Sequence, residues 1–327
     1  MVSRITIKDV AELADVSPAT VSRVLNHGPT VAEDLRDRVM AAIRQLGYRP
    51  NSQARFLRTR ATTVLGLIIS DITNPFFTSM VRGAEDAASK AGYSVVLANT
   101  DEDLDKERRY IEVAAAENMA GVILSPASAT RTSIELLLER GVPVVTVDRR
   151  LQTAKVDRVG VNNVRAAQEA VIRLVDQGCR RIGFIAGPAE VTTAADRLSG
   201  YKHGLRASGL PFSRELVVRG DYRIEGGRAA AATLMRLDPR PDALFVSNNL
   251  MTLGAVMTLR DLGLSYPSDI KLAAFDDMSW TLGLSDTMTL ISQPTYEIGR
   301  QACELLLRRI AGERFPPRHV VLGATLD

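Results

Sequence analysis

The chain has 327 residues, too many for one ordinary domain and enough for two or three. Apolar residues make up 46% and charged residues 24%, the balance of a soluble globular protein. No apolar run approaches the roughly 20 residues that span a bilayer, and the N-terminus carries acidic residues without a long apolar core. We therefore expect no signal peptide, no membrane partner and a cytoplasmic location.

The residue types that bind metals and form disulfides are few and scattered. Cys179 and Cys303 stand far apart in the sequence and form no CxxC pair, which favours two reduced buried thiols. The three histidines lie in unrelated segments. We expect no metal site and no cofactor.

Basic charge is concentrated at the N-terminal end. Residues 1–60 contain ten basic and six acidic residues, a net charge of +4, which leaves −1 for residues 61–327 out of the total of +3. A basic end on a nearly neutral body is typical of a module that binds a polyanion. On its own this signal is weak, because many solvated helices are basic.

Three helices are predicted in the first 48 residues. Thr6 and Asp9 resemble a capping box before a first helix that runs to about residue 14, with Val10, Leu13 and Ala14 facing inward. Ser17 is a strong N-cap residue and Pro18 suits the first position of a second helix over 18–25. A third helix over 33–46 precedes Gly47. Two short helices across a tight turn follow the helix-turn-helix plan, although spacing alone does not exclude a generic three-helix bundle.

Two stretches carry a specific resemblance. Residues 7–26 read IKDVAELADVSPATVSRVLN and residues 47–51 read GYRPN. Both closely resemble the headpiece of the LacI/GalR (lactose repressor) family of transcription regulators. The resemblance continues through the rest of the chain. It implies a DNA-binding headpiece over 1–48, a hinge over 49–60 and an effector-binding, dimerising core over 61–327.

The second helix is expected to enter the major groove, where its N-terminal side chains contact base edges. The candidates are Pro18, Ala19, Ser22 and Arg23, of which Arg23 can donate two bonds to guanine. Ser17, Thr20 and Asn26 suit phosphate or sugar contacts, which position the protein without reading sequence. From the resemblance, we assign further DNA contacts to Thr6, Tyr48, Asn51 and Arg58.

Residues 51–60 hold three arginines and one apolar pair. A plain flexible tether is one interpretation. The resemblance implies instead a hinge helix that folds on DNA, with Ala54 in the minor groove and Leu57 wedged into a base step, which is a known way to kink DNA. A helix this short is marginal alone, so its folding can depend on DNA and on a partner hinge.

From residue 64 onward, apolar β-branched runs alternate with helical segments, which indicates parallel sheets covered on both faces. The first series of predicted strands is 64–71, 93–100, 121–126, 142–148 and 159–161. The second is 181–187, 216–220, 243–247, 271–275 and 290–293. Two series predict an α/β core of periplasmic-binding-protein type, with two doubly wound subdomains and a ligand at the carboxyl ends of the strands.

The resemblance also implies three crossings between the two subdomains, near 160–163, near 291–293 and around Val320. The N-lobe is then about 61–160 and 292–319, and the C-lobe about 161–291 and 320–327. The last helix of the N-lobe is expected over about 296–311.

Candidate effector-binding residues lie just after the predicted strands. Those after the first and fourth strands are Asp71, Asn74, Phe76, Phe77, Asp148 and Arg149. By resemblance, the C-lobe contributes Arg197, Tyr222, Asn248 and Asp276. Acidic, amide and guanidinium groups beside an aromatic wall suit a polyhydroxylated ligand such as a sugar or sugar derivative. Pro75 and Phe76 also suit a helix cap and packing, and Asp148 suits a structural ion pair. Val191 is apolar where purine-sensing members place a base, which disfavours a purine.

Other protein classes fit less well. The chain has no GxSxG elbow, no P-loop and no GxGxxG after a strand, so we expect neither an enzyme nor catalytic residues. Asp101, Asp103, Asp105 and Glu112 have EF-hand spacing, but Lys106 replaces the required glycine, which favours a solvated loop and a helix start. A sugar-binding transport protein shares the core but lacks a headpiece.

The sequence thus predicts a sequence-specific transcription regulator, a repressor in the first instance, whose affinity for double-stranded operator DNA is controlled by a small sugar-like effector. We expect a homodimer, because a helix-turn-helix dimer reads two half-sites related by twofold symmetry. No leucine heptad follows the strand-like run at 320–326, so we expect no tetramer.

Overall fold

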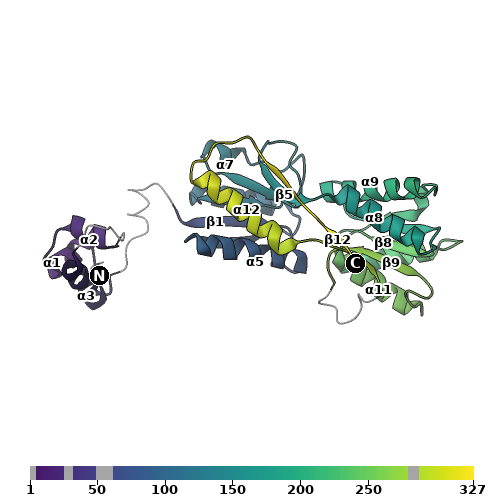
Figure 1. The fold of residues 1–327 in the computed structure, drawn as a ribbon, viewed down its shortest axis with the longest axis horizontal. Helices are drawn as coiled ribbons and strands as arrows, with labels where there is room; N and C mark the ends of the chain where they lie inside the picture. Colours follow the sequence, from purple (N-terminus) through teal and green to yellow (C-terminus); the bar gives the residue numbers. More distant parts are fainter. Residues whose placement is uncertain (1–4, 26–31, 49–61, 279–286) are drawn as a thin grey trace. The chain divides into compact units, whose positions relative to one another are not determined.

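The structure is a computed structural model that describes residues 5–25, 32–48, 62–278 and 287–327. The chain forms two compact units, Met1–Thr62 and Thr63–Asp327, which we call the headpiece and the core (Figure 1). Each unit is described by itself.

The headpiece contains three helices, at the positions that the sequence predicts: α1 (Ile7–Leu13), α2 (Pro18–Leu25) and α3 (Glu33–Leu46). Its small apolar centre consists of Val10, Ala11, Ala14, Val21, Val24, Val39 and Ala42. The prediction for Leu13 was wrong, because its side chain is 43% exposed and Ala11 is buried instead. The inward face of α1 follows the spacing i, i+3, i+4, i+7 from Ile7, which leaves Leu13 to one side of that face.

Polar contacts fix the ends of these helices. The Asp9 carboxylate accepts from the backbone N–H of Thr6 at 2.6 Å and from its hydroxyl at 2.8 Å. Gly47 ends α3 in the left-handed conformation, with φ of 61°, as expected of a glycine after a helix. Arg38 of α3 donates to the carbonyl of Ala14 at 2.7 Å, which ties the third helix to the turn between the first two.

The core contains two six-stranded sheets. The N-lobe sheet has the order β11-β5-β4-β3-β1-β2 and the C-lobe sheet the order β12-β10-β9-β8-β6-β7. Strands of the N-lobe are β1 (Val64–Ile69), β2 (Ser94–Asn99), β3 (Gly121–Leu124), β4 (Val144–Val147), β5 (Asp157–Val161) and β11 (His319–Leu322). Strands of the C-lobe are β6 (Ile182–Ala186), β7 (Val217–Arg219), β8 (Ala243–Val246), β9 (Lys271–Phe275), β10 (Thr289–Ser292) and β12 (Thr325–Leu326). All strand pairs are parallel except β10 with β12.

The chain crosses between the lobes three times. Two crossings follow β5 and β10, at the positions that the sequence predicts. The third lies at Gly323 and Ala324, between β11 in the N-lobe sheet and β12 in the C-lobe sheet. The prediction placed this crossing around Val320, but Val320 pairs with Val159 inside the N-lobe sheet. The strand-like run at 320–326 contains residues of both β11 and β12, and it was read as one strand.

Helices cover both faces of each sheet (Figure 1). In the N-lobe they are α5 (Pro75–Lys90), α6 (Leu104–Ala116), α7 (Glu135–Glu139) and α12 (Thr295–Ile310). In the C-lobe they are α8 (Asn163–Asp176), α9 (Thr192–Ala207), α10 (Ile224–Met235) and α11 (Asn249–Asp261), with a 3₁₀ turn at Arg214–Leu216. The last N-lobe helix, α12, lies within one residue of its predicted range.

Glycines allow neighbouring helices of the core to pack closely. A Cβ on Gly83 of α5 would lie 1.9 Å from the carbonyl oxygen of Tyr296, and a Cβ on Gly299 of α12 would lie 1.9 Å from that of Met80. Real Cβ atoms do not approach so closely, so only glycine permits this α5–α12 contact.

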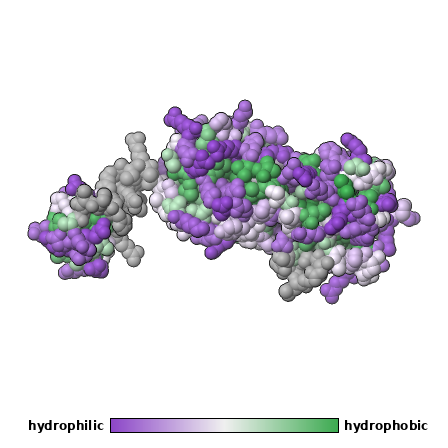
Figure 2. All heavy atoms as spheres, viewed as in Figure 1, coloured by the Kyte–Doolittle hydropathy of each residue, from purple (hydrophilic) through white to green (hydrophobic). Residues whose placement is uncertain are grey.

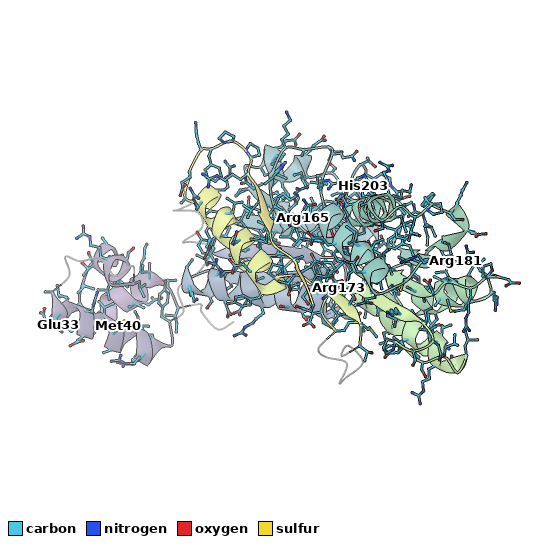
Figure 3. The ribbon with its side chains drawn as sticks, turned by 45° about the vertical axis from the view of Figure 1, so that its right-hand side comes forward. Glu33, Met40, Arg165, Arg173, Arg181 and His203 are labelled. Atoms are coloured by element: carbon cyan, nitrogen blue, oxygen red, sulfur yellow. The ribbon has the colours of Figure 1, made fainter. Side chains whose placement is uncertain are left out.

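On the face shown in Figure 2, hydrophilic residues of the core surround patches of hydrophobic ones. Arg165 and Arg173 lie on the solvent side of α8, whereas its opposite side packs into the C-lobe through Ala167, Ala170 and Val171 (Figure 3). Among the described residues, no helix combines the length and the apolar character needed to cross a bilayer.

Candidate functional site

One pocket lies in the cleft of the core, where the carboxyl ends of strands from both sheets meet. Its space is about 480 Å³, including the opening to solvent. The pocket is lined by Asp71, Asn74, Phe76, Phe77, Glu102, Asp148, Arg149, Thr193, Arg197, Asp221, Tyr222, Arg223, Asn248 and Asp276. All ten of the effector-binding candidates therefore line one pocket, the six that follow N-lobe strands and the four that the resemblance implies in the C-lobe.

Three of the ten predicted residues have a left-handed backbone. The φ angles are 61° at Asp148, directly after β4, 65° at Tyr222, after β7, and 76° at Asp276, directly after β9. Non-glycine residues adopt this conformation at an energetic cost, and such residues cluster at functional sites. All three of these residues line the pocket.

Arg197 is the central cation of the C-lobe side. It is 3% exposed, and its guanidinium stacks 3.8 Å from the centre of the Phe275 ring. Its Nε donates to Asn163 Oδ1 at 2.8 Å and its Nη1 to the carbonyl of Ser247 at 2.5 Å. These contacts hold the planar guanidinium in one orientation, so it is pre-organised for ligand binding.

Two buried carboxylates lie in the same pocket. Burial raises the pKa of Asp148 above its usual value, against the opposing effects of Arg149 and Arg197. Burial likewise raises the pKa of Asp276, although Arg197 and a hydrogen bond from Gln293 favour its charged form. The Gln293 Nε2–Asp276 Oδ1 distance is 2.5 Å. Carboxylates with raised pKa values in a cleft are typical of a functional site.

Other predicted residues serve the fold as well as the pocket. Asn74 caps α5 by accepting from the Phe76 N–H at 3.0 Å, and it also accepts from Asn249 of the C-lobe at 2.9 Å. Asn248 caps α11, and its amide donates to the Tyr222 carbonyl at 3.0 Å. Phe76 and Phe77 are buried and pack edge to face in the N-lobe core. The helix-cap interpretation of this loop therefore describes part of its role.

Four lining residues were missed by the sequence analysis: Glu102, Thr193, Asp221 and Arg223. Glu102 lies between β2 and α6, in the acidic run that was read as a solvated loop and helix start. The helix start is confirmed, because Asp103 accepts from the N–H groups of Asp105 and Lys106. Asp221 and Arg223 flank Tyr222 after β7, so the strand-end rule could have pointed to them, whereas Tyr222 was predicted from the resemblance.

In the headpiece, the start of α2 is open to solvent. Ser17, Pro18, Ala19 and Arg23 are exposed, while Thr20 and Ser22 are partly buried. Ser17 accepts from the Thr20 N–H at 3.1 Å, which confirms it as the N-cap residue. Tyr48 packs against the apolar centre of the headpiece. Asn26, Asn51, Ala54, Leu57 and Arg58 lie outside the described residues.

The described part of the chain holds no group of three histidine, cysteine, aspartate or glutamate side chains placed to bind a metal ion. Two of the acidic side chains in the cleft, Glu102 and Asp148, are paired with the Arg149 guanidinium.

The two units match two family models. Residues 6–51 match the bacterial regulatory proteins of the lacI family, and residues 62–324 match the periplasmic binding proteins and sugar binding domain of the LacI family. The chain belongs to the LacI family. It is a DNA-binding transcription regulator with a helix-turn-helix headpiece and a periplasmic-binding-protein core, and not an enzyme.

Individual relatives match over nearly the whole chain. Catabolite control protein A of Priestia megaterium is 37% identical over 93% of this chain and 92% of its own length. The solved complex of the regulator CelR with cellobiose is 33% identical, with a TM-score of 0.74 over 99% of this chain and 98% of its own. The lac repressor dimer bound to operator and the anti-inducer ONPF is 24% identical and shares the fold, with a TM-score of 0.87 over 99% of this chain and 98% of its own.

Proposed function

We propose that this LacI-family regulator binds a sugar-like effector in the pocket between its lobes, and that the effector controls its affinity for operator DNA. The observation that carries the proposal is the lining of the pocket. Acidic, amide and guanidinium groups from several strand ends surround one space, and they provide both donors and acceptors for hydroxyl groups. The cellobiose complex of CelR, a relative of similar length, adds support.

Binding to the pocket is tested with a thermal-shift screen of neutral sugars, beginning with cellobiose and ribose. A ligand that binds only the folded core raises the melting temperature, by an amount that grows with its concentration. Gel shifts with operator fragments then show whether the same sugar changes DNA affinity. If sugars leave both the melting temperature and operator binding unchanged, the proposal fails.

We propose that Pro18, Ala19, Ser22 and Arg23 face base edges in the major groove, with the exposed start of α2 as the supporting observation. Thr6, Ser17, Thr20 and Tyr48 are proposed to contact the DNA backbone. The resemblance of residues 7–26 and 47–51 to the LacI/GalR headpiece extends the proposed DNA interface to Asn26, Asn51, Ala54, Leu57 and Arg58.

Arg23→Ala is expected to relax base specificity. The loss of a bidentate contact to guanine costs about 1–3 kcal/mol of discrimination at that base pair. Binding to operator variants with each base at each position measures the loss. Arg36→Ala, which removes an exposed arginine from α3, is the matched control and should affect all variants equally. Equal losses on every sequence for Arg23→Ala would contradict the proposed base contact.

We propose that the protein acts as a homodimer, since two headpieces are needed to read two half-sites. The N-lobe sheet ends at β2, where Val96 and Leu97 are 48% and 39% exposed. Apolar side chains on an open strand edge are suited to an interface. Sedimentation at micromolar concentration should give a dimer, and a stable monomer or tetramer would contradict the proposal.

Effector binding is expected to weaken as the pH falls through the raised pKa values of Asp148 and Asp276. Hydroxyl groups donate to carboxylates, so the effector favours their charged forms and lowers their pKa values. The free protein shows the opposite trend. In the absence of effector, burial raises the pKa values of Asp148 and Asp276, so the contribution of these two groups to stability is greatest at low pH and is lost as the pH rises through the raised values. Titration calorimetry at a series of pH values measures the effect on effector affinity, and melting temperatures of the free protein at the same pH values measure the effect on stability. Asp148→Asn should flatten the pH profile of effector affinity.

A further inference from the structure

The side chains that line the pocket carry more acidic than basic groups. The acids are Asp71, Glu102, Asp148, Asp221 and Asp276, and the bases are Arg149, Arg197 and Arg223. Five carboxylates against three guanidinium groups make the pocket unfavourable for an anion, unless one of the arginines is free to pair with it. The hydrogen-bond and ion-pair partners of each arginine therefore determine whether the pocket can bind an anionic ligand.

Arg149 is paired with Glu102 in a two-pronged ion pair. Its Nη1 lies 2.5 Å from Glu102 Oε2 and its Nη2 lies 2.6 Å from Glu102 Oε1. The Nη1 group also donates to the Pro126 carbonyl at 3.3 Å, and Nε lies 3.4 Å from Asp148 Oδ2. Arg149 is 4% exposed. The fork that would otherwise bind a phosphate or a carboxylate is therefore already occupied.

The other two arginines are oriented by hydrogen bonds to amide and carbonyl groups, whereas Arg149 is the one held by a two-pronged carboxylate pair. Arg197 donates to Asn163 and Ser247, and it lies near both buried carboxylates of the pocket. Arg223 is exposed at the edge of the pocket and donates to the Asp101 carbonyl at 3.3 Å, across from the C-lobe to the N-lobe.

The loop that presents Glu102 is held in place by its own contacts. The backbone is left-handed at both Asp101 and Glu102, with φ of 54° and 65°. The Asp101 carboxylate accepts from Asn99 Nδ2 at 2.7 Å and from Lys106 Nζ at 2.5 Å. A ligand anion that displaced Glu102 would leave its carboxylate without its partner beside a negative pocket, which is unfavourable in a partly buried site.

We propose that the pocket selects an uncharged effector over phosphorylated sugars and sugar acids, and that Glu102 sets this selectivity by occupying the Arg149 guanidinium. This inference rests on the proposed function and narrows the class of effector. It assigns a role to a residue that the strand-end candidates did not include.

The test uses the full-length protein and the variant Glu102→Gln. Inorganic phosphate, compared with chloride at equal ionic strength, should raise the melting temperature of the variant and leave that of the wild type unchanged. The matched sugar pairs are glucose with glucose 6-phosphate and cellobiose with cellobionate. For the wild type the neutral member should bind more tightly. In the variant the affinity for the anionic member, relative to the neutral one, should rise about tenfold to a hundredfold, the range of a charge-assisted hydrogen bond.

Two further variants separate the freed arginine from a general change in charge. Asp71→Asn removes one acid from the same pocket, but Asp71 accepts from Thr73 rather than from an arginine, so this variant should show no such gain for phosphate. The double variant Glu102→Gln, Arg149→Met should lose the gain. An equal gain in Asp71→Asn, or a wild type that prefers an anionic member, overturns the assignment to Glu102. If no sugar binds the wild type but phosphate still stabilises only Glu102→Gln, the sugar proposal fails while the role of Glu102 stands.

Discussion

Replacing Arg197 with alanine should abolish the response to the effector while leaving operator binding intact. The guanidinium lies in the pocket, stacked on Phe275 and oriented by Asn163 and the Ser247 carbonyl. A hydrogen bond to a charged group contributes about 1.5–3 kcal/mol, so the loss of two such bonds to the effector weakens binding by a factor of hundreds or more. Operator binding depends on the headpiece, a separate compact unit.

Titration calorimetry with the effector and gel shifts with the operator measure the two properties separately. Arg165→Ala is the matched control, because Arg165 lies on the surface of the same lobe and pairs with Glu169 on its own helix. Arg197→Lys keeps the charge without the planar fork, so it should recover little of the affinity. If Arg197→Ala reduces effector binding and operator binding to the same extent, the arginine supports the fold rather than the effector.

The sequence predicted the strands and the N-lobe side of the pocket well because both follow from local patterns, whereas the C-lobe side was predicted from the family resemblance. Apolar β-branched runs mark buried parallel strands, and polar residues after them collect at one edge of the sheet. Asp148, directly after β4, is a pocket residue that this rule predicts, and it lies in the pocket together with Asp276, directly after β9. The headpiece helices were equally clear, since Ser17, Pro18 and Gly47 mark helix ends by their own chemistry.

What the sequence did not predict depends on contacts between distant segments. Glu102 lines the pocket paired with Arg149, which lies 47 positions away in the chain, so no local pattern indicates the contact. Thr193 lines the pocket from the first turn of α9, where no strand-end pattern indicates it. The last crossing lies at Gly323 and Ala324, because β11 pairs with β5 in the N-lobe sheet and β12 pairs with β10 in the C-lobe sheet. The sequence at 320–326 does not indicate which sheet each of these two strands joins.

The two lobes are linked across the cleft by side chains outside the pocket. Arg150 of the N-lobe pairs with Asp196 of the C-lobe, and its backbone N–H donates to Thr192 Oγ1 at 3.1 Å. Arg131 and Glu190 form a second pair between the lobes. These exposed and half-exposed pairs contribute little energy each, so the arrangement of the lobes is open to change by a ligand that contacts both.

Effector binding and operator binding should therefore be coupled through the lobe arrangement. The pocket takes residues from both lobes, whereas the chain enters the core from the headpiece only through β1 of the N-lobe. An effector that bridges Asp71 in one lobe to Arg197 and Asp276 in the other favours one arrangement. We propose that residues 49–60 of the two protomers respond to the lobe arrangement. In a dimer, the lobe arrangement sets the distance between the first core strands, β1, of the two protomers.

Linkage makes this coupling measurable from both sides. The factor by which saturating effector changes operator affinity must equal the factor by which saturating operator changes effector affinity, and couplings of this kind are about 5-fold to 150-fold. Calorimetry with and without operator gives one factor, and gel shifts with and without effector give the other. The core alone, residues 61–327, should bind the effector with an affinity that operator DNA does not change. Equal effector affinity of the full-length protein with and without saturating operator would show that the lobes do not transmit the signal, since a ligand shifts an equilibrium only through its difference in affinity for the two states.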